Sequence, residues 1–480
     1  MKMKQKIMEL KFGVNINMKK IFTFASVVMA LIFTGCTQND SFDSEGNKNS
    51  SDNQTSGNKI TLTVNAVTKN PEVKADGIEA NIMSKVAYGS TDATWEEGDK
   101  IFLIKSDGTT ITLTLTSGAG TISGSFSSTD AVVAGTYTPY AVSATSITKG
   151  YVSVSEGAIS LNLSTPGGGT LADALEHDVL KGNDITLEEN QKSATITGLN
   201  THMLSFLRFK FNATSKAISN VGMSSAGGVY RTVTIAADGT VSGSDSSTDA
   251  VNVTASTDGA NTYAGYFAVY GSTSTSLVAH AEDADGGKYS RLVSTNTANY
   301  TAGKVYGKTY TLSDAMMTAA ATGTLSDHNW KNLGLSVKWS DRYVYASDEY
   351  AYNRSFDSSG NTEPPSSWAG WRHPTREEVK ELYYASTLEW YSTDPNGMKF
   401  NCNGNYITMG ASGYHYDWEV GDRDDYVGER AYFFINETSG SNRTWSFITS
   451  TGLSFDTPNS RCTNVRCYTY YGAMRLVCDY

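Results

Sequence analysis

Hydrophobic and polar residues alternate with a period of two along much of residues 59–312. Ile60–Ala66, Ile111–Leu115 and Ile159–Leu163 are clear examples. Such alternation buries one face of a strand and leaves the other in water, which is typical of antiparallel sheets packed as sandwiches. Turn signals such as Asp107-Gly108 and Asp238-Gly239 separate the runs. The pattern predicts a mainly β fold without a long helix in this region.

A different period begins at Thr375. Thr375 and Glu378 have the spacing of a capping box, in which each side chain accepts a hydrogen bond from the other residue's backbone N–H. Val379, Leu382 and Tyr383 then fall on one face of a helix. We therefore predict an amphipathic helix from Thr375 to about Ser386 that lies on a sheet.

One apolar run, Ile21–Phe33, follows Lys19 and Lys20 near the start of the sequence. It is too short to span a bilayer as a mature helix, and it matches the hydrophobic region of a signal peptide. We expect residues 1–35 to be a signal peptide, with the true start at Met18.

The run ends in small residues and Cys36, and this ending resembles the lipobox of bacterial lipoproteins. The resemblance implies cleavage before Cys36, a lipid on its sulfur, and a membrane tether made of lipid alone. An ordinary cleaved signal with an incidental cysteine, or a buried apolar strand, is the alternative interpretation.

Residues 36–58 are polar and almost free of apolar side chains, so they cannot bury enough surface to fold. They predict a flexible tether. Asp40, Asp43 and Glu45 resemble the signal that sends some lipoproteins to the outer face of the outer membrane. The expected location is therefore the outer membrane, on the cell surface or in a fimbrium.

Composition excludes some partners and divides the chain. The 480 residues carry a net charge of -11, with no basic run outside the signal, so nucleic acid is not an expected partner. The membrane is expected as a partner through the lipid anchor only. Of the eight Trp, only Trp95 precedes residue 330. We expect a small polar linker at residues 313–327 and a separate domain at 328–480.

Several fragments of residues 59–312 resemble fimbrillin-like proteins, the subunits of type V pili. The resemblance implies two tandem antiparallel β-sandwiches, at residues 59–183 and 184–312, and other pilus subunits as partners. In that family a protease removes an early strand, and a C-terminal strand of a neighbour fills the groove. Trp95 is expected in the core, and His202 as a packed, hydrogen-bonded residue. The fragments are Trp95–Ile101, Tyr137–Tyr140, Asp173–Leu180, Leu199–Leu204, Ala302–Tyr306 and Tyr310–Leu312.

Residues 328–480 resemble the Fibrobacter major paralogous domain, which implies an α+β, C-type-lectin-like fold. The match departs from the family at Met409–Ser412 and at Ala431–Phe434. The matching fragments are Leu333–Trp339, Trp371–Glu378, Gly404–Ile407, Gly410–Tyr414 and Tyr471–Val477.

This domain offers candidate ligand-binding side chains. Aromatic rings can stack on sugar faces, and carboxylates can accept hydrogen bonds from sugar hydroxyls. Core packing and a solvated acidic turn are the alternative roles of these residues. Three clustered carboxylates also suit calcium, but we predict no obligatory metal and no cofactor. The candidates are Trp368, Tyr414, Tyr416, Trp418, Asp422, Asp424 and Asp425.

Four cysteines lie late in the sequence: Cys402, Cys462, Cys467 and Cys478. Outside the cytoplasm thiols tend to pair, and four cysteines allow three pairings. Cys462 and Cys467 are a candidate disulfide, and unpaired buried thiols are the alternative. Their spacing also resembles the reactive pair of formylglycine-generating enzymes, which implies an oxidase. We predict that the protein is not an enzyme.

Three functions follow from these patterns. The first is a lipid-anchored fimbrial tip or accessory adhesin whose C-terminal domain binds a glycan or a host or bacterial surface protein. The second is a surface lipoprotein that captures glycans without polymerising. The third is an oxidase that works through Cys462 and Cys467.

Overall fold

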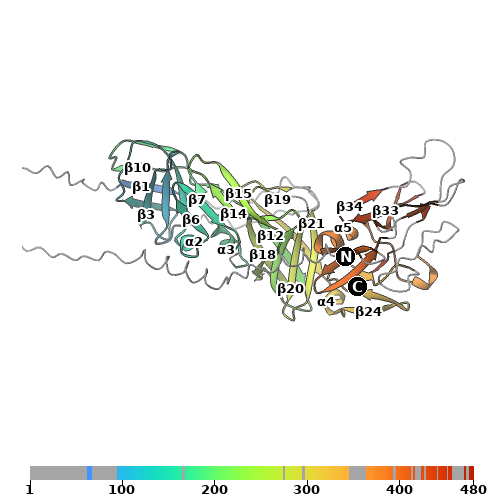
Figure 1. Ribbon diagram of the computed structural model, residues 1–480. Coiled ribbons are helices and arrows are strands. Elements are labelled where there is room, and N and C mark those ends of the chain that lie inside the picture. Colours follow the sequence, from blue (N-terminus) through green and yellow to red (C-terminus); the bar gives the residue numbers. More distant parts are fainter. Residues whose placement is uncertain are drawn as a thin grey trace, which may run out of the picture. The chain divides into compact units, whose positions relative to one another are not determined.

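The fold is described from a computed structural model (Figure 1). It describes residues 62–67, 94–164, 168–273, 276–294, 298–344, 364–392, 396–411, 414–416, 423–425, 429–439, 442–450, 452–456, 470–471 and 475–480. The predicted signal peptide and tether, with Cys36, lie outside these ranges. Within them, no helix is both long and apolar enough to cross a membrane.

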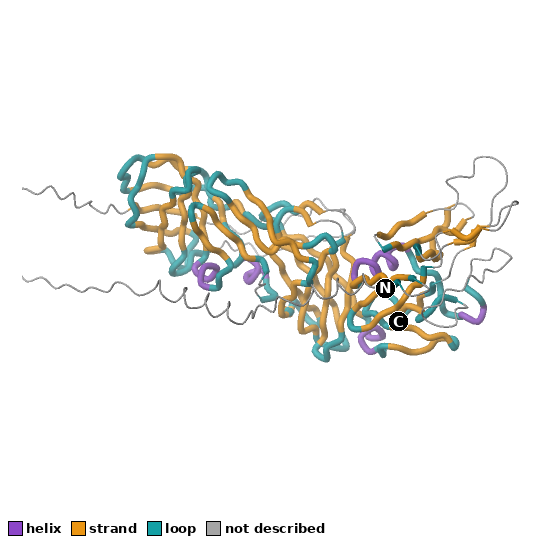
Figure 2. Tube along the Cα trace, viewed as in Figure 1, coloured by secondary structure: helices purple, strands orange, loops and turns teal. Residues whose placement is uncertain are grey.

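Strands make up most of the described structure, which confirms the mainly β prediction (Figure 2). The helices are short, and no long one occurs in the described part of residues 59–312. They are α2 (Ala144–Thr148), α3 (Leu171–Leu175), α4 (Asp314–Thr318) and α5 (Arg376–Ala385), with the 3-10 turn η2 (Ser366–Trp368).

The largest sheet has nine strands in the order β10-β1-β4-β3-β2-β5-β8-β11, with β9 paired to β5. Its strand β2 is apolar from Ile101 to Ile104, because both faces are buried there: Ile101 packs near Trp95, and Phe102 packs in a second core. Trp95 is 3% exposed, as expected. The strands are β1 (Leu62–Val67), β2 (Lys100–Ile104), β3 (Thr110–Ser117), β4 (Ser123–Ser128), β5 (Gly135–Val142), β8 (Leu180–Lys181), β9 (Ile185–Leu187), β10 (Ser193–Thr195) and β11 (Thr201–His202).

A second sheet, in the order β15-β14-β7-β6, joins strands from before and after residue 183. The core beneath it is also shared, since Ile159 and Leu161 pack with Val233 and Ile235. Strand pairing thus crosses the expected boundary here and again where β9 and β10 join the first sheet. The strands are β6 (Val152–Ser155), β7 (Ala158–Asn162), β14 (Val229–Ile235) and β15 (Val241–Ser247).

Two four-stranded sheets, β17-β18-β12-β23 and β16-β13-β20-β21, enclose the next core. In β12, Leu207, Phe209 and Phe211 face that core, as period-two alternation requires. Two short strands, β19 (Ser272–Thr273) and β22 (Ala298–Asn299), pair antiparallel with each other. The remaining strands are β12 (Ser205–Ala213), β13 (Ile218–Ser225), β16 (Val251–Thr254), β17 (Ser256–Thr257), β18 (Thr262–Val269), β20 (Leu277–Asp283), β21 (Lys288–Ser294) and β23 (Val305–Leu312).

The segment expected to be a linker, residues 313–327, is folded. Ser313 caps α4 by accepting from the backbone N–H of Met316. Met316 and Met317 are buried in the core of the preceding sheets. Its small polar residues predicted a linker, but burial of these two methionine side chains holds the segment against the preceding sheets.

The described part of residues 322–480 forms four small sheets, and α5 packs against β28 and β32 of two of them. The capping box of Thr375 and Glu378 is present, and the helix ends before Ser386, as predicted. Val379 and Leu382 are buried against strands β28 and β29. The strands are β24 (Thr322–Leu325), β25 (His328–Lys331), β26 (Lys338–Ser340), β27 (Thr387–Tyr391), β28 (Gly397–Cys402), β29 (Asn405–Gly410), β30 (Tyr414–Tyr416), β31 (Arg423–Asp425), β32 (Ala431–Ser439), β33 (Asn442–Thr449), β34 (Gly452–Asp456), β35 (Tyr470–Tyr471) and β36 (Val477–Cys478).

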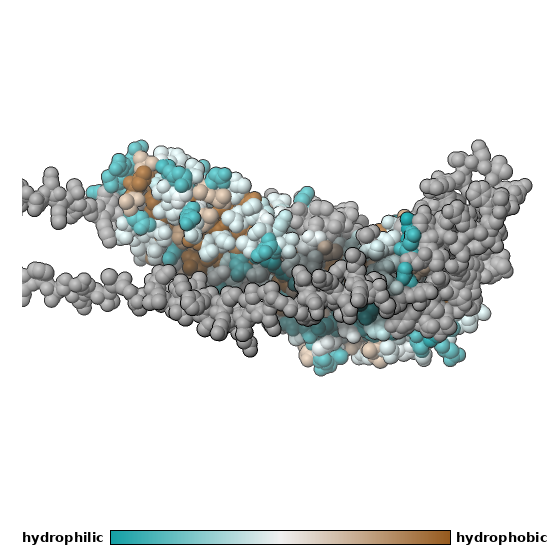
Figure 3. All heavy atoms as spheres, viewed as in Figure 1, coloured by the Kyte–Doolittle hydropathy of each residue, from teal (hydrophilic) through white to brown (hydrophobic). Residues whose placement is uncertain are grey.

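The face shown in Figure 3 carries mostly hydrophilic and neutral residues over the large sheets, with small hydrophobic areas between them. Among the described residues, Ile122 and Val133 are the exposed large hydrophobic side chains. Isolated apolar residues of this kind are normal on a protein surface.

Candidate functional site

Strand β1 lies inside the first sheet, between β4 and β10. It pairs antiparallel with β4 from Leu62–Ser128 to Val67–Ser123, and parallel with β10. Its neighbours use both of its backbone edges, so removing β1 would expose unpaired backbone groups on β4 and β10. If β1 were removed, β4 and β10 would present open edges at this position of the sheet.

Two strands late in the chain, β23 and β36, could in principle pair with another subunit, but both are paired within this chain. β23 pairs in parallel with β12 from Val305 to Leu312. β36 pairs with β26, where Trp339 is opposite Val477. Releasing either strand would break a buried sheet.

The edge of β21 is covered by the loop at the start of the C-terminal domain. The backbone N–H of Ser290 donates to the carbonyl of Gly334 at 2.9 Å. Two side chains of β23 also contact the backbone of β21. The hydroxyl of Tyr310 donates to the carbonyl of Leu292 at 3.3 Å, and Nζ of Lys308 donates to the carbonyl of Val293 at 3.4 Å. An edge strand with its backbone groups occupied in this way is poorly available for pairing with another chain.

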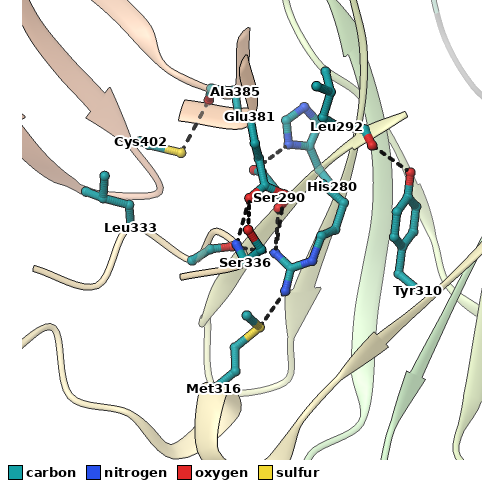
Figure 4. A network of polar contacts seen from close by, with 12 residues as sticks. His280, Ser290, Leu292, Tyr310, Met316, Leu333, Ser336, Glu381, Ala385 and Cys402 are labelled. Carbon is teal, nitrogen blue, oxygen red and sulfur yellow. Dashed lines mark hydrogen bonds and ion pairs between the residues drawn. The ribbon is translucent and has the colours of Figure 1, made fainter. Parts of the chain in front are cut away.

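On the same strand, Arg291 forms a buried ion pair with Glu381 of α5, with Nη1 and Oε1 4.0 Å apart (Figure 4). Arg291 also donates to the carbonyls of Ser290, at 2.6 Å, and Gly334, at 3.2 Å. Glu381 accepts from the backbone N–H of Ser336 at 2.8 Å and from its hydroxyl at 2.5 Å. Both charges are thus satisfied by hydrogen bonds in the interior, as a buried ion pair requires.

A second chain of hydrogen bonds runs beside the first (Figure 4). Nδ1 and Nε2 of His280 lie 2.9 Å and 2.7 Å from the hydroxyls of Ser290 and Ser224. Asn403 donates to the carbonyl of Leu333 at 2.7 Å. Burial lowers the pKa of His280 to about 4, so the imidazole is neutral near pH 7. We call this set of contacts between β21 and residues 333–336, α5 and Asn403 the β21 joint.

No pattern in the sequence predicted the β21 joint. One signal was available, because Arg291 alternates with Tyr289 and Val293, which both face the core of their sheets. A charged residue on an apolar face needs a buried partner. Nothing in the sequence identifies that partner as Glu381.

The candidate ligand-binding residues are placed only in part. In the hairpin of β30 and β31, Tyr414 is the pairing partner of Asp425 and His415 that of Asp424. Tyr416 pairs with Tyr470 of β35. The hairpin therefore places the backbones of Tyr414 and Asp425 opposite each other, while Trp418 and Asp422 lie outside the described residues.

Trp368 is located in a small core. It is 4% exposed, and its ring stacks on His328 with centroids 3.6 Å apart. Trp371 meets it edge-on at 5.2 Å. In this arrangement the ring serves packing, and its faces are not open for stacking on a sugar.

Cys402 and Cys478 are buried free thiols, while Cys462 and Cys467 lie outside the described ranges. Burial raises the pKa of Cys402 to about 12 and that of Cys478 to about 11. Because Cys402 and Cys478 are unpaired, Cys462 with Cys467 is the remaining candidate disulfide among the four late cysteines. Where side chains are described, no group of three or more His, Cys, Asp or Glu is arranged to hold a metal ion.

His202 is packed and hydrogen-bonded, as predicted. Its Nδ1 lies 2.5 Å from Oδ2 of Asp178, and the other carboxylate oxygen accepts from the backbone N–H groups of Met203 and Leu204 at 3.0 Å. This contact holds β11 and the start of β12 against the turn that follows α3.

No protein-family model matches the chain, and no curated protein matches it. Among solved structures, it is similar to a candidate cell adhesion protein from Bacteroides uniformis, with 15% identity over 55% of this chain and 95% of that chain and a TM-score of 0.33. A candidate cell adhesion protein from Bacteroides ovatus has 15% identity over 52% and 91%, with a TM-score of 0.35. The tip fimbrial protein Mfa3 of Porphyromonas gingivalis has 10% identity over 53% and 96%, with a TM-score of 0.28.

The lectin-like resemblance of residues 328–480 is not addressed by these structures and stays a prediction. The three structures named above are described as cell adhesion or fimbrial proteins.

Proposed function

We propose that this protein is a cell-surface fimbrial adhesin that is exported as a lipoprotein with its lipid on Cys36 and stands at the tip of a pilus or in an accessory position; the cleavage described below would release it from that lipid. Its C-terminal domain binds a glycan or a surface protein. The lipid anchor comes from the resemblance of the segment ending at Cys36 to a lipobox.

The proposal rests on the pairing of three strands. β1 could be replaced in its sheet by a strand of another subunit, whereas β23 and β36 are paired within this chain and are not free to be given to another subunit. β1 is held between β4 and β10, and Lys69 and Lys74 follow it closely in the sequence. Cleavage at either lysine would separate β1 from the rest of the chain and allow a strand of another subunit to replace it. β23 and β36 are used internally, so the described part of the chain accepts a strand more readily than it donates one.

A subunit that accepts a strand without donating one ends a polymer. This asymmetry supports a terminal position over a place in the shaft. The β21 joint supports the same position, because it fixes a folded domain where a shaft subunit would need an open connection to its neighbour.

The test uses residues 37–480 treated with trypsin in the presence of type V pilus shaft subunits. We expect loss of the β1 peptide, seen by mass spectrometry, and gold label at one end of the assembled pili. Label along the shaft, or retention of β1 together with failure to join, would contradict the proposal.

A locked variant provides the matched control. Asn65 and Ser125 are pairing partners in β1 and β4, so Asn65→Cys with Ser125→Cys can be joined by a disulfide. The oxidised variant should stay out of the pilus, and reduction should restore joining. Wild-type protein with and without reductant shows whether the other cysteines matter.

Glycan capture without polymerisation is a second candidate, because no arginine precedes Arg208 and an arginine-specific protease has no early target. A glycan array with residues 37–480, intact and after trypsin treatment, separates the two. Binding by the intact chain combined with no joining to shafts would favour capture.

A further inference from the structure

The place of β1 in the first sheet has one side that faces the core. The register defines this side, because Val64 is opposite Phe126 of β4 and Ala66 is opposite Gly124. Directly opposite residues of an antiparallel pair lie on the same face of a sheet. Phe126 is fully buried in the core that contains Trp95. The positions of Val64 and Ala66 therefore both belong to the core face.

The position opposite Gly124 has little room. An added Cβ on this glycine would lie 2.7 Å from Cδ1 of Leu115 and 2.9 Å from atoms of both Phe126 and Trp95, so three side chains already cover it. The two aromatic rings meet edge-on, with centroids 4.8 Å apart. The backbone N–H of Trp95 also donates to the carbonyl of Thr121 at 2.9 Å. A large residue on the neighbouring strand would have to displace this packed cluster, and overpacking a core is costly.

The position opposite Phe126 has a different environment. On its other side, β10 places Ala194 in register with Val64, and Ala194 packs against the same core. Ile196, just past the end of β10, is 2% exposed in that core. The described residues around this position are apolar, so a polar side chain there would lose its water without replacement.

The other side of the strand sets no such limits. Thr63 and Asn65 are opposite Ser127 and Ser125 of β4, and both serines are half-buried. Polar side chains on this face keep contact with water, so the two faces make different demands on a strand that lies here.

We propose that the strand that replaces β1 is selected at two core-facing positions: it carries an apolar residue opposite Phe126 and an alanine or glycine opposite Gly124. The partner is then a pilus subunit whose donated strand has an apolar-polar-small sequence at this point, as Val64–Ala66 has in β1 itself. This inference rests on the proposed replacement of β1 and adds to it which strands are accepted.

Peptide exchange tests the selection without shaft subunits. Residues 37–480 are nicked with trypsin, the trypsin is inhibited, and an excess of fluorescent peptide of residues 59–68 is added. Size-exclusion chromatography then measures the peptide captured at a series of concentrations. We expect the natural sequence to be captured, and the Ala66→Leu peptide to bind at least about tenfold more weakly. The Ala66→Gly peptide should be accepted.

A matched pair of peptides tests the second position. Val64→Thr puts a hydroxyl on the core face and should weaken capture at least about fivefold. Thr63→Val makes the reverse exchange on the outer face and should leave capture unchanged. Equal capture of all these peptides would overturn the selection and leave the replacement of β1 intact, whereas capture of none would overturn both.

A variant of the chain tests the cause of the size limit. Leu115 is half-buried at the end of β3, and Leu115→Ala removes one of the three side chains that cover Gly124. We expect the weakening caused by Ala66→Leu in the peptide to shrink severalfold in this variant. An unchanged ratio would contradict the role assigned to the cluster over Gly124.

Disulfide trapping checks the register on which the two positions depend. A peptide with Asn65→Cys should crosslink to the chain with Ser125→Cys, because these positions are opposite each other. The control is Ser246→Cys, at an exposed position of β15, which should not crosslink. Capture of the peptide without a crosslink at Ser125→Cys would mean another register and would overturn the assignment.

Discussion

Arg291 on β21 and Glu381 on α5 form a buried ion pair across the β21 joint, with Nη1 and Oε1 4.0 Å apart. The arginine is 8% exposed and the glutamate 5%. The pair connects a core strand of the large sheets with the helix of the C-terminal domain, so the two regions should unfold together rather than independently.

Removing one partner should therefore be costly. Arg291→Met leaves the carboxylate of Glu381 buried without its cation, and we expect a loss of about 3 kcal/mol in the free energy of unfolding measured with urea. Arg291→Met with Glu381→Gln should cost less than the sum of the single changes. Lys149→Met breaks a more exposed pair with Glu176 and should cost under about 1 kcal/mol. Equal losses for Arg291→Met and Lys149→Met would contradict the role assigned to the joint.

Gly334 should resist replacement more than another glycine of similar conformation. Its φ is +67°, and an added Cβ would overlap with the carbonyl oxygen of Lys288. Gly404 has a φ of +84° with open space around it. Gly404→Ala should cost about 1–2 kcal/mol from the backbone alone. Gly334→Ala should cost clearly more and should make residues 333–336 cleavable by protease, and similar stability of the two variants would count against docking of this loop.

Stability should fall as pH drops below about 6.5. The pKa of His280 is lowered by burial to about 4, from 6.5 in the unfolded chain. Between these values the unfolded state binds the proton first, so the contribution is complete above pH 6.5 and is lost as pH falls toward 4, by up to about 3 kcal/mol.

Urea unfolding from pH 4.5 to 7.5 measures this dependence, with His280→Gln as the comparison. The variant should show a shallower slope, with a remainder from His177, whose pKa is lowered in the same direction. Identical slopes would mean that His280 does not carry the effect.

The thiols of Cys402 and Cys478 should be inert in the folded protein. Burial raises both pKa values well above 9, so little thiolate forms at neutral pH. In residues 37–480 with Cys462→Ser and Cys467→Ser, iodoacetamide should label neither thiol until urea unfolds the chain. Peptide mapping by mass spectrometry checks this, and labelling of either thiol without urea would disagree with its burial.

Local patterns were predictable where residues close in sequence decide the structure. The hydroxyl of Thr375 and the carboxylate of Glu378 meet within one helical turn, and this fixes where α5 begins. Alternation in residues 111–115 and 159–163 similarly required strands with one buried face. Gly108 and Gly239 adopt positive φ at the turns where the sequence placed them.

Contacts between residues far apart in sequence were decided by the tertiary structure. The pairing of β7 with β14, the burial of Met316 and Met317, and the stacking of Trp368 on His328 each depend on elements that only packing brings together. A charged residue such as Arg291 shows in the sequence that a partner is needed, but the partner is chosen by the fold. The β-rich elements and the start of α5 thus follow from local sequence patterns, while the β21 joint exists because long-range packing places its residues side by side.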